Sequence, residues 1–199
     1  DVSHKRIQMT SDLLPADIVG VSLYDEPTRE FRFVPGPVFA NVVIADEINR
    51  APPRTQSALL EAMNDAAVTV DGATRALPAP FLVIATQNPA DHHGAYPLPE
   101  SQLDRFLVRS SLGYLDAESE IRVLLEDPAT QRLRDLKPVI DSADVLRLQS
   151  ATDETTLGRP LAEYIRALAD SSRSRAELAA GISTRGALAV ARMARASAR

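Results

Sequence analysis

The stretch VVIADEINR, from Val42 to Arg50, decides the fold of this chain. Its first four residues are apolar and three of them are β-branched, which is typical of a strand that is covered on both faces in a parallel sheet. Two carboxylates, Asp46 and Glu47, follow at once. Because ligands of open α/β sheets bind beyond the carboxyl ends of the strands, this pair marks a candidate site.

The residues that follow this strand predict an α/β layer. Pro52 and Pro53 fit the first turn of a helix whose apolar residues then recur at helical spacing. A hairpin is predicted next, because Asp71-Gly72 separates two β-rich runs. A second wholly apolar strand follows at Phe81–Ala85. Two buried strands joined through a helix are the pattern of a parallel sheet with helices packed on it.

The two ends of the chain differ in their predicted elements. Upstream, residues 11–20 predict a helix that ends at Gly20, and residues 23–36 predict two short strands around a polar turn. Beyond about Tyr114 the strand signals stop, and helices are predicted over residues 116–127, 142–151, 160–172 and 183–199. We therefore expect a base, residues 1–114, and an all-helical region, residues 115–199, with the boundary near residues 113–116.

The composition is that of a soluble globular protein and argues against several classes of function. The net charge of −5 disfavours sequence-independent binding to DNA, and the lack of cysteine excludes disulfides and thiolate chemistry. The three histidines, His4, His92 and His93, lack the spacing of a metal site. No apolar run approaches the roughly 20 residues that cross a bilayer, and the first residues do not read as a signal peptide. We expect a cytoplasmic protein.

Three polar residues follow the two apolar strands and suggest hydrolytic chemistry. Of Asp46 and Glu47, one could help to hold Mg²⁺ through oxygen ligands while the other accepts a proton or orients a water. Asn88 follows the second strand, and its amide could hold a water against a phosphate. Each has a simpler interpretation: the acids could cap the next helix, and Asn88-Pro89 could initiate a turn.

Arginines supply the remaining candidates. Arg105 and Arg109 are predicted four residues apart on one helix within LPESQLDRFLVR, where they could match phosphate oxygens or form surface ion pairs. Arg185 falls in the first turn of a helix capped by Ser183 or Thr184. A cation there opposes the helix dipole, so a bound anion would explain it, although the penalty is at most about 1 kcal/mol.

Four stretches, in their order and spacing, resemble the MoxR family of AAA+ ATPases, in the helix-2-insert group that also holds the magnesium-chelatase ATPase subunit. They are RIQMTSDLLPADIVG (6–20), the specific central stretch FVPGPVFANVVIADEINRAPPRTQSALLEAMNDAAVTVDGATRALPAPFLVIATQNP (33–89), YPLPESQLDRFLVR (96–109) and GISTRGALAVARMARA (181–196). Together they span nearly the whole chain.

The resemblance implies roles for residues of the base. VVIADE is similar to the Walker B strand, so Asp46 would support Mg²⁺ and Glu47 would activate the hydrolytic water. Asn88 is similar to the sensor 1 residue. Arg105 resembles the arginine finger that acts on ATP bound to the neighbouring subunit, and Arg109 is a weaker contender for that role.

The same resemblance implies roles for other parts of the chain. Arg185 is similar to the sensor 2 residue, which reaches the γ-phosphate from the helical lid. Residues 21–35 would be the helix-2 insert, and residues 66–79 the hairpin before sensor 1. The implied fold is most of an αβα parallel-sheet base followed by a small helical lid.

The function that the resemblance implies is that of an ATPase motor with ATP and Mg²⁺ as cofactors. Subunits would associate in a ring, expected to be a hexamer, and would couple hydrolysis to remodelling of client proteins. Chaperone-like maturation or metal-cofactor insertion, often with a von Willebrand factor A domain protein as partner, is typical of such relatives. No nucleic-acid partner and no membrane segment are expected.

One departure from the family pattern concerns the phosphate-binding loop. The motif G-x-x-x-x-G-K-[ST] does not occur, and the only lysines are Lys5 and Lys137. In relatives this loop precedes the RIQ stretch, so we expect it upstream and expect the chain as written not to hydrolyse ATP. The GISTRG stretch also lacks the proline that usually precedes the sensor 2 arginine. Two alternatives stay open: a non-catalytic module derived from an ATPase, and a chelatase-type motor subunit.

Overall fold

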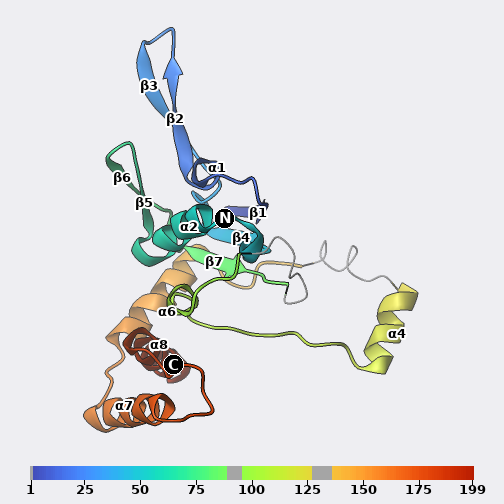
Figure 1. Ribbon diagram of the computed structural model, residues 1–199, viewed down its shortest axis with the longest axis vertical. Coiled ribbons are helices and arrows are strands. Elements are labelled where there is room, and N and C mark those ends of the chain that lie inside the picture. Colours follow the sequence, from blue (N-terminus) through green and yellow to red (C-terminus); the bar gives the residue numbers. More distant parts are fainter. Residues whose placement is uncertain (1, 89–95, 127–135) are drawn as a thin grey trace.

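A three-stranded parallel sheet forms the centre of the computed structural model, which describes residues 2–88, 96–126 and 136–199 (Figure 1). The strands are β1 (His4–Gln8), β4 (Val42–Asp46) and β7 (Leu82–Ala85), in the order β1-β4-β7. Both pairings are parallel. The parallel sheet predicted from the two apolar runs is therefore confirmed, whereas β1 was not predicted.

One face of this sheet is closed and the other is partly open. Val43 and Ala45 on β4 are fully buried, while Ile44 between them is half-buried. On β7, Leu82 is 54% exposed and Ile84 is 48% exposed. The expectation that the apolar strands are covered on both faces therefore holds for one face only.

The buried face shares its core with two helices, α1 (Pro15–Val19) and α2 (Pro53–Asp65). The helices contact each other. They carry the start and stop signals seen in the sequence, because Pro53 begins α2 and Gly20 ends α1. The fully buried apolar side chains of this core include Met9, Ile18, Val38, Val43, Ile48, Leu59 and Leu60.

Two antiparallel hairpins project from the base (Figure 1). The first pairs β2 (Gly20–Asp25) with β3 (Glu30–Pro35), and the second pairs β5 (Ala67–Val70) with β6 (Ala73–Ala76). In the second turn, Asp71 and Gly72 have φ values of 52° and 73°, as a two-residue hairpin loop requires. Both hairpins were predicted, and both are confirmed.

The rest of the described chain is helical or extended. After α3 (Glu100–Leu103) an extended segment leads to α4 (Ala117–Glu126), which Figure 1 shows well apart from the sheet. The C-terminal helices are α6 (Ser142–Glu154), α7 (Arg159–Arg173) and α8 (Thr184–Ser197), and they confirm the helices predicted there. No helix among the described ranges is both long and apolar enough to cross a bilayer.

Polar side chains fix the ends of the C-terminal helices. Asp141 caps α6 by accepting the backbone N–H of Asp144 at 2.8 Å, and this hydrogen bond lowers the pKa of Asp141. Arg199 joins α8 to α6 by donating to the carbonyl of Ala151 and to Thr155 Oγ1, both at 2.9 Å. Helix α8 also contacts α7. The division of the chain at residues 114 and 115 stays a prediction.

Candidate active site

The carboxyl ends of the parallel strands meet at one edge of the sheet. The register pairs Gln8 of β1 with Asp46 of β4. On the other side, the backbone N–H of Thr86 donates to the carbonyl of Ala45 at 3.0 Å. Gln8, Asp46 and Thr86 therefore lie next to one another, and Glu47 follows directly. The structure thus places both acids of VVIADE where strands end in an open α/β sheet.

The Asp46 carboxylate has a partner from each neighbouring strand. Arg6 of β1 forms an ion pair with Oδ2. The hydroxyl of Thr86 donates to Oδ1 at 3.2 Å. The Asp46 side chain is 14% exposed, whereas that of Arg6 is 71% exposed. Such an ion pair at the surface contributes little to stability, so we read these contacts as orienting the carboxylate.

Glu47 leaves the strand in the left-handed region, with φ 54° and ψ 52°. Its backbone N–H donates to Thr86 Oγ1 at 3.0 Å. Its Oε2 accepts from Gln8 Nε2 at 3.4 Å and from Arg50 Nη1 at 3.0 Å. The tight turn continues into η1 (Ile48–Arg50). The turn keeps the two adjacent acids at the same edge and gives each carboxylate its own partners.

Three residues of this edge were missed from the sequence: Arg6, Gln8 and Thr86. Thr86 has the largest structural role, because its single hydroxyl accepts from the Glu47 backbone and donates to the Asp46 carboxylate. Its position directly after the apolar run 81–85 was a usable signal. Arg6 and Gln8 flank the buried Ile7 at a spacing of two, which was the signal for β1.

Asn88 lies two residues beyond Thr86, where the chain leaves β7, and it is exposed. It therefore follows the strand that pairs directly with β4. A contact between its amide and a water at the acids stays a prediction.

His92 and His93 lie outside the described residues.

The arginine pair of LPESQLDRFLVR does not lie on one helix. Helix α3 ends at Leu103. The backbone N–H groups of Arg105 and Phe106 bond to carbonyls three residues earlier, which is the pattern of a tight final turn and not of a continuing α-helix. Phe106 packs against the core, and Arg109 lies in the exposed segment that follows. The predicted four-residue spacing on a helix is wrong, because the helix ends before either arginine.

Arg105 is held away from the two acids. It is half-buried, and its Nη1 donates to the carbonyl of Leu60 in α2 at 3.4 Å. Its Nε is buried and has no hydrogen-bond partner among the described residues. Within the described part of the chain, no contact joins Arg105 to Asp46 or Glu47. The structure therefore leaves this arginine outside the carboxylate cluster of its own chain.

Arg185 is the second residue of α8 and is exposed. The helix is capped by Ser183, whose Oγ accepts the backbone N–H of Gly186 at 3.0 Å, so Ser183 rather than Thr184 is the cap. No hydrogen bond or ion pair joins the Arg185 guanidinium to another residue in the described ranges. Its approach to a phosphate stays a prediction.

The donor set at the sheet edge fits a magnesium ion. Mg²⁺ prefers oxygen ligands and is commonly held by one or two carboxylates together with substrate phosphates. Asp46, Glu47 and the Thr86 hydroxyl supply such oxygens. Among the described residues there is no group of three or more His, Cys, Asp or Glu side chains that could hold a metal unaided. Phosphate oxygens and waters would therefore complete the coordination.

Comparison with solved structures supports the fold. The chain is similar over its whole length to a candidate ATPase from Cytophaga hutchinsonii, with a TM-score of 0.84 and 40% identity. The match covers 63% of that protein.

Curated relatives are similar in sequence. The chain is 46% identical over 192 residues to the uncharacterized protein YeaC of Bacillus subtilis, covering 96% of this chain and 60% of YeaC. It is 44% identical over 160 residues to the chaperone MoxR1 of Mycobacterium tuberculosis, covering 80% of this chain and 42% of MoxR1. The chain thus spans less than two thirds of each of these relatives.

The family comparison covers the base. Residues 1–108 match the model of the ATPase family associated with various cellular activities (AAA), and this range contains the sheet, both hairpins and the two acids. Since this is more than half of the chain, and since the MoxR1 relative shares 44% identity, the chain belongs to the AAA family of ATPases and is of the MoxR type.

Proposed function

We propose that the full-length protein hydrolyses ATP and uses the energy to remodel client proteins. The observation that carries this proposal is the Asp46-Glu47 pair at the carboxyl end of β4, oriented from both sides by Thr86, Arg6 and Gln8. Family membership makes ATP the expected nucleotide. We infer a cytoplasmic location from the cysteine-free sequence.

The two acids divide the work. Asp46 is oriented by Thr86 to help hold Mg²⁺, which when bound would neutralise charge on the phosphates. Glu47 accepts a proton from the attacking water, or orients it, as a general base does. Its contacts with Gln8 and Arg50 use one carboxylate oxygen, Oε2, and Oε1 forms no hydrogen bond with the described residues. That oxygen is free to accept from a water.

The remaining candidates act on charge and position. Asn88, just past β7, would hold the water in place. Arg105 would act on ATP bound to a neighbouring subunit, a role supported by its separation from the acids of its own chain. Arg185 would contact the γ-phosphate from α8. Arginines supplied in trans can raise phosphoryl-transfer rates by about 10³–10⁵.

An arginine that acts in trans requires assembly, so we propose a ring, of six subunits by family resemblance. A chaperone-like role is suggested by the name of the MoxR1 relative. Metal-cofactor insertion and a von Willebrand factor A domain partner belong to the same proposal and rest on the family resemblance alone.

The central test is Glu47→Gln in the full-length protein. The variant keeps shape and hydrogen bonding but cannot accept a proton, so we expect ATP binding to persist while turnover falls by about 10² or more. Glu61→Gln is a matched control, because Glu61 lies exposed on α2. Unchanged turnover in Glu47→Gln would remove Glu47 from its role.

The trans role is tested by mixing subunits. Arg105→Ala should be inactive by itself, whereas rings mixed with Glu47→Gln subunits should recover turnover, because each Arg105→Ala site can receive Arg105 from a Glu47→Gln neighbour. Confirmed mixed rings without any recovery would contradict an arginine finger at this position.

A further inference from the structure

The last turn of α7 binds the segment that leads into α8. It does so through the backbone N–H and the backbone carbonyl of a single residue, Ile182. The backbone N–H of Ile182 donates to Ser172 Oγ at 2.8 Å. The carbonyl of Ile182 accepts from Arg173 Nε at 2.9 Å. Two consecutive residues of α7 therefore fix both the position and the orientation of the segment before α8.

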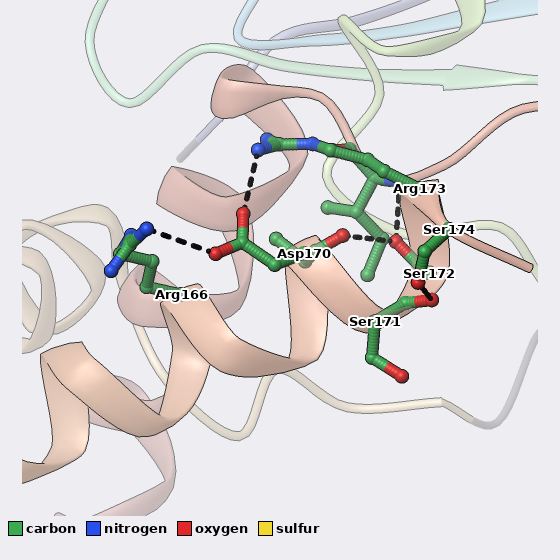
Figure 2. Close-up of polar contacts among 8 residues, drawn as sticks. Arg166, Asp170, Ser171, Ser172, Arg173 and Ser174 are labelled. Atoms are coloured by element: carbon green, nitrogen blue, oxygen red, sulfur yellow. Dashed lines mark hydrogen bonds and ion pairs between the residues drawn. The ribbon is translucent and has the colours of Figure 1, made fainter.

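The two side chains that hold Ile182 are themselves held (Figure 2). Ser172 Oγ donates to the carbonyl of Ala169 at 2.7 Å, which leaves its lone pairs facing Ile182. Arg173 Nη1 pairs with Asp170 at 3.2 Å, and Figure 2 shows Asp170 between Arg173 and Arg166, its second partner at 3.1 Å. These contacts within α7 orient the hydroxyl and the guanidinium toward Ile182.

Gly181 makes the close approach possible. A Cβ atom at this position would lie 2.5 Å from both Cα and Cγ of Arg173, and 2.7 Å from its backbone nitrogen. Those distances are below any real contact, and two of the three atoms are backbone, so a larger residue would push the segment away from α7. We call Ser172, Arg173 and Gly181 the α7–α8 clamp.

Ile182, the residue that the clamp holds, lies only three residues before Arg185. Ile182 is followed by Ser183, whose hydroxyl caps α8 through the N–H of Gly186. The backbone around Arg185 is therefore held before it, at Ile182, by Ser172 and Arg173, and after it, at Gly186, by the Ser183 hydroxyl. In the described part of the chain, Arg185 has no polar partner of its own. The held backbone fixes the point from which the Arg185 side chain extends.

We propose that the α7–α8 clamp positions Arg185 toward nucleotide, so that Ser172, Arg173 and Gly181 are positioning residues for ATP binding. This inference rests on the proposed contact between Arg185 and the γ-phosphate. Among the described residues of the helical region only Ile165 and Ala169, both on α7, are buried, and Arg199 fixes the far end of α8 to α6, so the clamp is the polar contact at the end of α8 that carries Arg185. Misplacing a group that contacts the substrate by about 1 Å can lower the rate by about 10². Loss of the clamp should therefore have a measurable effect even though its residues do not touch the nucleotide.

The test compares two serines on the same turn. Ser172→Ala removes the acceptor for Ile182. Ser174→Ala removes a hydroxyl whose one hydrogen bond to the described residues is to the carbonyl of Ser171, at 3.0 Å. Binding of a non-hydrolysable fluorescent ATP analogue with Mg²⁺ to the full-length protein is the readout. We expect Ser172→Ala to weaken affinity about three- to tenfold and Ser174→Ala to leave it unchanged. Ser172→Thr should restore it.

A double-mutant cycle separates positioning from general stability. In an Arg185→Ala background, neither Ser172→Ala nor Gly181→Ala should lower the affinity for the analogue further, because the side chain that Ser172 and Gly181 position is gone. Equal losses in both backgrounds, or equal affinities for Ser172→Ala and Ser174→Ala, would overturn the clamp. Arg185→Ala by itself reports on the proposed function: if it binds the analogue normally, the role of Arg185 fails and the clamp proposal fails with it.

Discussion

The base and the helical region of this chain are stabilised by different means. In the base, one apolar cluster joins the sheet, α1 and α2, and its largest side chains are fully buried. In the described part of the helical region, Ile165 and Ala169 alone are buried, and on α4 Leu124 and Leu125 are 79% and 80% exposed. Helices α6, α7 and α8 depend more on caps, ion pairs and hydrogen bonds between segments.

The comparison teaches where substitutions should act. In the base, the polar residues of the candidate site rest on a packed core, so their geometry follows from strand register. In the helical region, the position of Arg185 follows from a few polar contacts. Core substitutions should therefore affect stability most in the base, and single hydrogen bonds should matter most for orientation in the helical region.

The largest expected effect distinguishes two leucines. Leu59→Ala on α2 removes a fully buried side chain, so the free energy of unfolding should fall by about 2–5 kcal/mol. Leu168→Ala on α7, where the side chain is 44% exposed, should cost about 1 kcal/mol or less. Urea unfolding of the full-length variants measures both. Similar losses at the two positions would contradict the contrast between the regions.

A smaller effect is expected at Thr86. Thr86→Val keeps the shape but removes both hydrogen bonds that orient the two acids, each worth about 0.5–1.5 kcal/mol. Turnover should fall about tenfold, since each 1.4 kcal/mol of barrier changes the rate by about that factor. Thr86→Ser should retain activity because it keeps the hydroxyl. If valine and serine behave alike in ATPase assays, Thr86 does not orient the acids.

The smallest effect concerns the cap of α8. Ser183→Ala removes the acceptor for the N–H of Gly186 and should destabilise the first turn by about 1 kcal/mol. Faster hydrogen exchange at Gly186 is the sensitive measurement. Thr184→Ala is the control, since Thr184 is exposed and does not cap the helix. Equal exchange rates at Gly186 in the two variants would show that the Ser183 hydroxyl does not stabilise the first turn of α8.

Local patterns predicted most elements of the fold. The apolar runs around Val42 and Leu82, the Asp71-Gly72 turn and the proline at the start of α2 each specify structure within a few residues, and each is confirmed. Strand β1 was missed because only Ile7 of its five residues is buried, so its pairing with β4 depends on partners about 40 residues away. A short polar strand carries too weak a pattern by itself.

The candidate site divides in the same way between residues marked by a local pattern and residues that depend on long-range pairing. Asp46 and Glu47 stand out because they interrupt an apolar run, whereas Arg6, Gln8 and Thr86 acquire their role only through register. The helix predicted through Arg109 fails because Phe106 packs on the core and the chain then becomes extended, which periodicity does not reveal. The structure gives the positions of these side chains, and the roles of Asp46, Glu47, Asn88, Arg105 and Arg185 remain predictions.

The left-handed backbone at Glu47 has a consequence for anyone engineering this protein. A non-glycine residue with φ near 54° carries a conformational cost of about 1–2 kcal/mol, which glycine would relieve. Selection for thermal tolerance alone would favour glycine here wherever that relief exceeds the loss of the Glu47 contacts with Gln8 and Arg50, and it would remove the acid to which we assign water activation in the full-length protein. A screen that retains nucleotide turnover as a second criterion is the safeguard against that trade-off.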